Sequence, residues 1–270
     1  MIQSVLETII SAKQQAVEQA QQQRPLPELM RLVRESPQPR DFKAALLGAG
    51  LSVIAEIKKA SPSRGVMVEN LDVCDVARQY EEAGAAAISV VTEEAFFAGH
   101  LQDVQAVKQV VGLPVLRKDF IFDAYQVWES RAAGADAILL IASLFDMPVL
   151  RTFILLARRL RMATLVEIRT SDDLKKALDA GADLVGVNAR DLNHFVVDLR
   201  VPLSLAPLIP PGIVKVAESG IKTAEDLRSI RQAKFDAVLI GETLMRAEHP
   251  GGKLRELIHE SATHSSRQIA

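Results

Sequence analysis

Short runs of β-branched and aliphatic residues recur along the chain from Val53 onward, and a longer amphipathic segment follows each run. The eight runs occupy residues 53–57, 86–91, 114–118, 137–141, 163–168, 184–188, 213–219 and 237–241. Short apolar runs that alternate with about ten to fifteen residues of helical pattern predict βα units and a parallel sheet. Nearly continuous apolar runs are typical of strands that are buried on both faces.

A repeat within the chain supports the same prediction. The segments EEAGAAAISVV, RAAGADAILLI, LDAGADLVGVN and RQAKFDAVLIG share one order of helix end, turn and strand. Their turn positions Gly84, Gly134, Gly181 and Lys234 lie 50, 47 and 53 residues apart, which is the length of two βα units. Glycine is favoured where a helix ends in this way, so Lys234 departs from the pattern. Eight evenly spaced units favour an α/β fold of the (β/α)8 TIM barrel type over a doubly wound sheet.

The first fifty residues have a different pattern. Residues 4–23 carry apolar positions at roughly helical spacing and a Gln-rich outer face, with Lys13 interrupting the apolar stripe. Pro25 and Pro27 end this helix, and a second short helix follows. We expect residues 1–45 to form a helical extension that packs on the barrel or covers its active site. Residues 46–260 would form the barrel, and residues 261–270 a disordered tail.

Composition excludes several classes of function. The chain of 270 residues has 32 Lys and Arg against 34 Asp and Glu, so no strong field favours nucleic acid or an anionic membrane. Cys74 is the only cysteine, which excludes a disulfide within the chain and a thiolate metal cluster. No apolar run approaches the ~18 residues of a membrane span, and the N-terminus lacks the pattern of a signal peptide. We therefore expect a cytoplasmic protein without nucleic-acid or membrane partners.

Charged and polar residues interrupt the apolar runs near their C-terminal ends, where TIM barrels carry their active sites. They are Glu56, Lys58, Lys118, Glu167, Asn188, Glu218 and Ser219. Charges within apolar runs are costly unless they are paired. A salt-bridge network that braces the barrel mouth would explain them, but so many charges that converge on one rim favour an active site.

Small residues follow the last two runs. Ser219 and Gly220 come after the seventh run, and Gly241 ends the eighth. Small residues there allow backbone N–H groups to approach an anion, and TIM barrels commonly bind phosphate at this place. Ser61 or Ser63, in the predicted loop KKASPSRG, could reach the same phosphate. Ordinary turns are the alternative interpretation.

Six of these segments together resemble the indole-3-glycerol-phosphate synthase family. They are EIKKASPS at 56–63, LRKDFI at 116–121, RAAGADAILLI at 131–141, LVEI at 165–168, GVNARDL at 186–192 and AESGI at 217–221. The resemblance covers roughly residues 40–247 in order, and the N-terminal helices also resemble the extra segment that the family has ahead of its first strand. It implies a decarboxylating cyclase of the lyase class, a monomer or weak homodimer, that needs no cofactor and no metal.

The resemblance also implies the reaction. The substrate 1-(2-carboxyphenylamino)-1-deoxyribulose 5-phosphate condenses, loses CO₂ and then loses water, which gives indole-3-glycerol phosphate in tryptophan biosynthesis. By motif position, Lys118 would be the general acid that protonates the sugar carbonyl, and Glu167 would serve the later proton transfers. Glu56 and Lys58 would orient Lys118 and the substrate carboxylate, and Asn188 would help to hold the substrate.

The substrate-binding positions follow from the same motifs. They are Ser61, Ser219, Gly220 and Gly241 for the phosphate, with Arg190, Glu218 and Glu242 as further contacts. Phe97 and Phe120, with Phe96 and Phe122, could build the pocket for the aromatic ring. Since a lysine acid at neutral pH benefits from a lowered pKa, we expect Arg117 and Lys58 to lower that of Lys118.

Two positions depart from the family pattern and keep alternatives open. Ala189 stands where the family usually has a second Asn, and His100 stands where it usually has Ser. A paralogue that acts on a different, non-phosphorylated aryl keto substrate in secondary metabolism would share the Lys and Glu set. A Schiff-base aldolase that uses Lys118, and a non-catalytic barrel that serves as a scaffold, are further alternatives.

Overall fold

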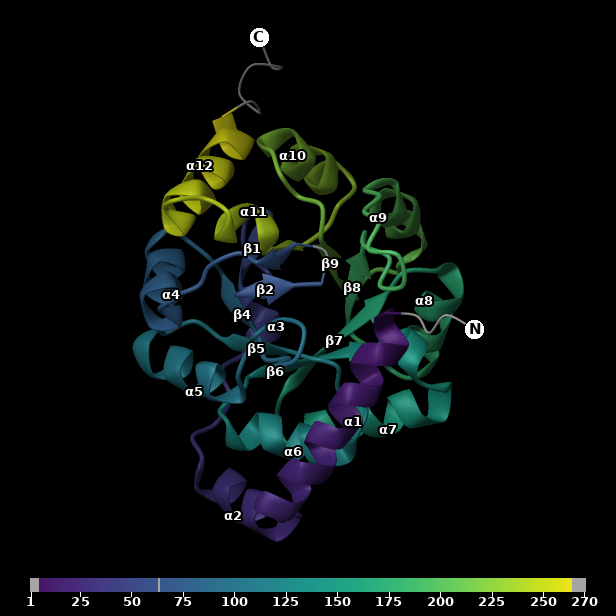
Figure 1. Cartoon of the computed structure of the whole chain (residues 1–270). Helices are drawn as coiled ribbons and strands as arrows, with labels where there is room; N and C mark the ends of the chain where they lie inside the picture. The colour runs from purple at the N-terminus through teal and green to yellow at the C-terminus, as the bar shows by residue number, and fades with distance from the viewer. Residues whose placement is uncertain (1–4, 63, 264–270) are drawn as a thin grey trace.

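Eight parallel strands form a closed barrel in the computed structural model, which describes residues 5–62 and 64–263 (Figure 1). They are β1 (Ser52–Ile57), β4 (Ala87–Val91), β5 (Val115–Lys118), β6 (Ala137–Ile141), β7 (Ala163–Ile168), β8 (Leu184–Asn188), β9 (Val214–Glu218) and β10 (Ala237–Ile240). Neighbours in the barrel follow chain order, and β10 closes on β1. The predicted TIM barrel is confirmed, and each predicted run matches its strand to within one residue at either end.

Helices connect the strands and surround the barrel (Figure 1). They are α4 (Val73–Glu82), α5 (Leu101–Val110), α6 (Ala124–Ala132), α7 (Met147–Arg159), α8 (Ser171–Asp179), α9 (Arg200–Leu205), α10 (Ala224–Gln232), α11 (Glu242–Met245) and α12 (Pro250–Thr263), with short 3₁₀ turns at Ala142–Leu144 and Ala206–Leu208. The apolar outer faces of the strands and the inner faces of these helices form one large buried cluster. Burial on both sides explains why the strands read as continuous apolar runs.

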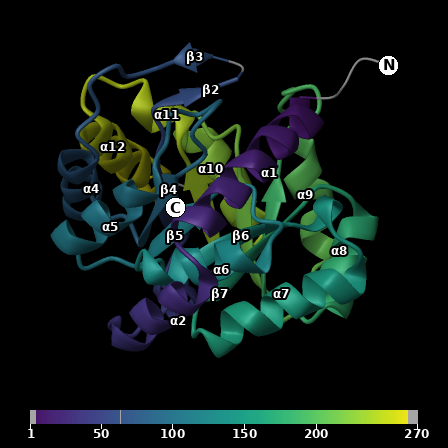
Figure 2. The same ribbon diagram turned by 60° about the horizontal axis from the view of Figure 1, so that its bottom comes forward.

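Three helices precede the barrel, namely α1 (Val5–Gln23), α2 (Leu26–Glu35) and α3 (Phe42–Ala45). Both α1 and α2 lie along the outside of the barrel beside α6 (Figure 2). The hydroxyl of Tyr125 in α6 donates to the carbonyls of Ala20 and Arg24, each at 2.9 Å, and so holds the C-terminal end of α1. The barrel and this helical pair therefore share a packed interface.

The lumen of the barrel explains how the site is positioned. Ile54, Leu116, Leu165 and Val216 belong to one buried apolar cluster in the lumen. Because side chains alternate along a strand, the residues two positions further along point to the same side. Those residues are Glu56, Lys118, Glu167 and Glu218, so the apolar layer forms the floor of a charged layer at the carboxyl ends of the strands.

The repeated turns have the backbone conformation that the sequence predicts. Gly84, Gly134 and Gly181 have φ values of 91°, 88° and 90°. Lys234, at the fourth equivalent position, also has a positive φ, of 61°. A residue with a Cβ atom is strained in this conformation, so Lys234 makes the fourth turn less stable than the three turns that have glycine.

Several local expectations need correction. The segment KKASPSRG is not a plain loop, because β2 (Ala60–Ser61) and β3 (Gly65–Val66) pair in it as a short antiparallel hairpin. Cys74, the only cysteine, lies on α4 and is half-buried. Residues 261–263 belong to α12, and the rest of the predicted tail lies outside the described residues, as does Ser63. Within the described parts of the chain, no helix combines the length and apolar character of a membrane span.

Candidate active site

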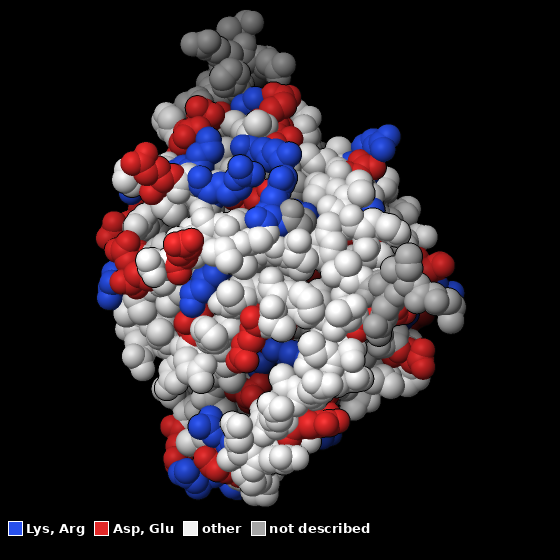
Figure 3. All heavy atoms as spheres, in the orientation of Figure 1, with Lys and Arg blue, Asp and Glu red and all other residues white. Residues whose placement is uncertain are grey.

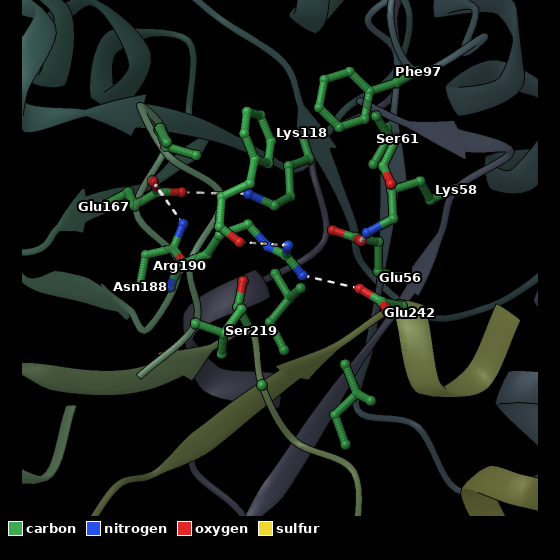
Figure 4. Close-up of a pocket in the computed structure, with 18 of the residues that line it drawn as sticks. Glu56, Lys58, Ser61, Phe97, Lys118, Glu167, Asn188, Arg190, Ser219 and Glu242 are labelled. Carbon is green, nitrogen blue, oxygen red and sulfur yellow. Dashed lines mark hydrogen bonds and ion pairs between the residues drawn. The ribbon is translucent and has the colours of Figure 1, made fainter. Parts of the chain in front are cut away.

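A cavity of about 700 Å³ opens at the carboxyl ends of the strands. Its walls include most of the predicted site residues, which point into it from separate strands and loops (Figure 4). They are Glu56, Lys58, Ser61, Phe97, Lys118, Phe120, Glu167, Asn188, Arg190, Ser219, Gly220, Gly241 and Glu242. The volume falls in the range of sites that enclose a small organic ligand. The structure thus brings together residues that lie up to 186 positions apart in the sequence, from Glu56 to Glu242.

Lys118 lies at the centre of the charged layer. Its Nζ is 3.3 Å from Oε2 of Glu167 and 3.4 Å from Oε2 of Glu218. Asn188 donates from Nδ2 to the other oxygen of Glu167 at 2.9 Å, as Figure 4 shows, which fixes the orientation of that carboxylate. The lysine that the sequence singles out is therefore held by two carboxylates, one of them oriented by an amide.

The expected lowering of the pKa of Lys118 is wrong. Burial alone would lower this pKa, but the carboxylates of Glu167, Glu218 and Glu56 outweigh burial and raise the pKa above its ordinary value. The side chain of Arg117 cannot oppose them, because its guanidinium lies on the other side of the strand and donates to Glu129 and Ser130 of α6. Lys118 therefore stays protonated over the whole physiological pH range.

Glu56 and Lys58 form a second charged pair on β1 and the residue that follows it. Nζ of Lys58 donates to Oε1 of Glu56 at 2.6 Å. Burial alone would raise the pKa of Glu56, but the ammonium groups of Lys58 and Lys118 lower it below its ordinary value. A Cβ atom at Gly241 would overlap the carboxylate of Glu56, so this glycine is needed for the charged pair.

Glu218 lies beside Lys118 but is not among the described residues that line the cavity. Its side chain is 1 % exposed, and neither of its oxygens has a hydrogen-bond partner among the described residues. Burial raises its pKa to about 8, although Lys118 opposes the shift. A Cβ atom at Gly186 would overlap Oε1 of Glu218, so Gly186 makes the space in which this carboxyl lies. The predicted contact of Glu218 with substrate stays a prediction.

The opposite end of the cavity is basic. Ser219 and Gly220 have φ values of 66° and 82°, so a tight left-handed turn follows β9 there. The carboxylate of Glu242 accepts from Nε of Arg64 and from Nη2 of Arg190, each at 2.9 Å. The walls also include Lys222 and Arg246, and Figure 3 shows basic side chains gathered on this part of the surface near α11.

Two aromatic rings form one wall. The rings of Phe97 and Phe120 lie with their centroids 6.2 Å apart and tilted by 44°. Phe96 and Phe122, which the sequence groups with them, are not among the described residues that line the cavity. The aromatic wall therefore consists of one phenylalanine after β4 and one after β5.

Sequence reasoning missed three functional candidates. Glu93 accepts the backbone N–H groups of Ala95, Phe96 and Phe97 at 2.7–3.0 Å, which holds the turn that carries Phe97. Arg64 reaches Glu242 across the mouth, and Asp119 lines the cavity directly after Lys118. Asp119 had a visible signal, since a second charge follows the central lysine in LRKDFI. Glu93 and Arg64 lie in loops whose conformation the hydrophobic pattern does not predict.

Comparisons with known proteins agree on one family. The family model described as indole-3-glycerol phosphate synthase matches residues 6–257. The chain is 44% identical over 261 residues to the indole-3-glycerol phosphate synthase of Carboxydothermus hydrogenoformans, covering 94% of this chain and 99% of that one. It is 50% identical over 224 residues to the protein of that name from Koribacter versatilis, covering 82% and 86%.

Solved structures show the fold alone. The 3-hexulose-6-phosphate synthase of Salmonella typhimurium aligns with a TM-score of 0.63 at 13% identity, covering 79% of this chain and 100% of that one. The thiamine phosphate pyrophosphorylase of Pyrococcus furiosus aligns with a TM-score of 0.61 at 16% identity, covering 81% and 97%. Both alignments place this chain among barrels of the same architecture.

Proposed function

The chain belongs to the indole-3-glycerol phosphate synthase family, and from that premise we propose which residues of the cavity carry out the ring closure. The activity is that of a decarboxylating cyclase, and the reaction class is that of a carbon–carbon lyase. The single observation that carries the proposal is the half-buried ammonium of Lys118, held by the buried Glu167 and Glu218 on a floor of apolar side chains.

Lys118 is the general acid of the condensation. The aromatic carbon that bears the carboxylate attacks the sugar ketone, a carbon–carbon bond forms, and the ketone oxygen becomes an alkoxide that takes a proton from Lys118. An alkoxide is a stronger base than the amine of lysine, so the raised pKa of Lys118 does not prevent this proton transfer. The raised pKa also ensures that the donor is fully protonated before the reaction begins.

Glu167 serves the later steps. After the carbon–carbon bond to CO₂ breaks and the aromatic ring is restored, the new hydroxyl leaves as water and one proton must be removed from the ring being formed. The carboxylate of Glu167 is oriented by Asn188 and lies 3.3 Å from Lys118. It can therefore accept that proton, while Lys118, which regains a proton from solvent after the condensation, protonates the departing hydroxyl so that it leaves as water.

The two ends of the cavity suit the two ends of the substrate. Phe97 and Phe120 would pack on the aromatic ring, and Lys58 would hold the carboxylate until it leaves as CO₂. Ser61 and the turn at Ser219 and Gly220 would bind the phosphate, together with the arginines that now contact Glu242. Glu242 itself would have to release Arg64 and Arg190, so its carboxylate competes with the phosphate for them.

Alternative functions receive less support. The relatives named above carry the synthase name over most of their length, so the paralogue with a different aryl keto substrate has no support from the comparisons. A Schiff-base aldolase requires a lysine that loses its proton readily, whereas Lys118 has a raised pKa. A scaffold without activity does not account for buried charges that face a cavity.

The experiment is a steady-state assay with 1-(2-carboxyphenylamino)-1-deoxyribulose 5-phosphate, following the indole product by fluorescence. Turnover of about 1 s⁻¹ or faster with a micromolar KM is expected of an ordinary enzyme on its own substrate. A folded protein that binds no phosphate-bearing product analogue, as judged by an unchanged Tm at millimolar concentration, would contradict the proposal. A borohydride adduct on Lys118 would support the aldolase instead.

Three further expectations stay predictions. We propose a monomer or weak homodimer located in the cytoplasm, since the composition favours neither a membrane nor a nucleic acid. We also propose that residues 1–45 act as an extension of the barrel at 46–260, in line with the packing of α1 and α2 on α6.

A further inference from the structure

Lys13 on α1 is a buried charge that the docking of this helix does not explain. It lies on the barrel-facing side of α1 between Ile9 and Val17, and the three side chains are 8 %, 1 % and 6 % exposed. Its Nζ is 2.8 Å from Oδ2 of Asp119. Burying an ion pair costs desolvation that its attraction often fails to recover, so an apolar residue would serve docking at least as well.

The attachment of α1 already has other sources. Tyr125 holds the carbonyls of Ala20 and Arg24, and Val17 packs with Leu29 and Tyr125 in a separate apolar cluster. These contacts attach the part of α1 that is C-terminal to Lys13 to the helices α2 and α6. The role of Lys13 therefore depends on its ion-pair partner, Asp119, rather than on the attachment of α1.

Asp119 organises the chain on either side of the central lysine. Its Oδ2 accepts from Thr92 at 2.6 Å and from Arg117 at 2.9 Å, and its Oδ1 accepts the backbone N–H of Phe120 at 2.8 Å. The backbone N–H of Thr92 donates in turn to the carbonyl of Lys118 at 3.1 Å. The carboxylate of Asp119 thus ties the backbone of Phe120 directly, and the backbone of Lys118 through Thr92, to one point.

The charges around Asp119 balance only when Lys13 is included. Lys13 and Arg117 are the cations of this cluster, and Asp119 and Glu129 are its carboxylates, with side-chain exposures of 9 %, 3 %, 0 % and 16 %. Burial alone would raise the pKa of Asp119, but Lys13 and Arg117 lower it to about 2. Without the ammonium of α1, the cluster would hold an uncompensated negative charge next to the mouth.

We propose that Lys13 is a positioning residue for the ring closure, acting through Asp119 on the placement of Lys118 and Phe120. The N-terminal helix α1 is in this sense part of the active site, although Lys13 does not line the cavity. The inference rests on the proposed role of Lys118 as the acid. Displacements of about 1 Å in a catalytic group can cost up to about 100-fold in rate, so a small shift of the β5 end is enough to matter.

The test compares Lys13→Met with Lys13→Arg in the full chain. Methionine keeps most of the aliphatic stem between Ile9 and Val17 and removes only the charge. We expect Lys13→Met to lower kcat about tenfold with KM changed less than threefold, because the acid is misplaced while the ligand contacts remain. Lys13→Arg, which restores a cation, should return kcat to within about threefold of the wild type.

Lys108→Met is the matched control for a lost buried ion pair. Lys108 on α5 contacts the buried Asp136 at 2.7 Å, at the start of β6 and therefore at the other end of the barrel. This variant should lower Tm while leaving kcat within about twofold. If Lys13→Met keeps wild-type kcat, or if both Met variants lower kcat equally at a temperature where both are folded, the inference is overturned. A wild-type chain without turnover of the substrate would instead overturn the proposed function, and with it this inference.

Discussion

The two ends of the barrel each hold a deeply buried carboxyl group, but only the one at the amino end accepts hydrogen bonds from described residues. At the amino end, Asp136 is 1 % exposed and accepts from Nζ of Lys108 and from the backbone N–H groups of Arg40 and Val115, at 2.7–2.8 Å. At the carboxyl end, Glu218 is equally buried, yet its oxygens accept no hydrogen bond from any described residue.

This difference indicates that the carboxyl at the amino end serves stability and that the one at the mouth serves chemistry. A fully bonded carboxylate fixes the strands and helices that it joins, whereas an unsatisfied carboxyl costs stability and persists only where the surrounding structure enforces it. The mouth gathers three carboxylates around one ammonium, and their attraction for its charge raises the pKa of Lys118. Natural proteins place such costly arrangements at functional sites. The amino end should therefore respond to mutation in stability, and the mouth in rate.

The largest effect is expected at the centre of the mouth. Lys118→Ala removes the proposed proton donor, so kcat should fall at least about 10³-fold, while a ligand analogue still binds. Lys43→Ala is the control, since Lys43 on α3 contacts Asp183 at 2.8 Å just before β8, at the amino end. It should leave kcat unchanged. Steady-state kinetics that show only a raised KM for Lys118→Ala would contradict its role as the acid.

Asp136→Asn tests the other end of the comparison. The neutral amide cannot compensate the charge of Lys108. Its NH₂ group would also replace an oxygen that accepts hydrogen bonds from Lys108 and from the backbone N–H group of Arg40 or Val115. Breaking a buried ion pair in this way costs about 3 kcal/mol, so Tm should fall by about 6–12 °C. Thermal unfolding measures the loss, and the same sample assayed well below its Tm should keep kcat within about twofold. A large loss of kcat there would show that the two ends are not independent.

Most of this division could be predicted from the sequence, and the exceptions have physical reasons. The apolar runs and the repeated turns predict the strands and the barrel, because periodicity reports which faces are buried. The converging charges predict the mouth. The pattern could not show that Lys13 is buried, since a lone lysine in an apolar stripe is usually solvent-exposed at its tip. It also could not give the sign of the pKa shift of Lys118, which depends on three carboxylates from three other strands.

The pH dependence of stability sharpens the comparison. The pKa of Glu218 is raised to about 8 from an ordinary value near 4.5, so the folded chain holds a proton that the unfolded chain releases. Its contribution to stability is therefore fully present below about pH 4.5 and is lost as the pH rises towards 8. Glu218→Gln removes this dependence. Its Tm relative to the wild type should increase by a few degrees between pH 5 and pH 8 and change little above that.

Thermal scans of both proteins at several pH values measure this difference. A gap between Glu218→Gln and the wild type that stays constant from pH 5 to pH 9 would argue that Glu218 is ionised throughout.

The smallest effect is expected in the turn that departs from the repeat. Lys234 is exposed and has a φ of 61°, where the three equivalent turns have glycine. Lys234→Gly should relieve backbone strain and stabilise the chain by roughly 0.5–1 kcal/mol, or about 1–4 °C in Tm. Gly181→Ala is the matched reverse, since a Cβ atom there meets nothing within 4 Å and the φ of 90° alone penalises it. The first should raise Tm, the second should lower it, and both should leave kcat unchanged, because these turns lie at the amino end of the barrel. A change in kcat without a change in Tm would place a functional role at the end that the comparison assigns to stability.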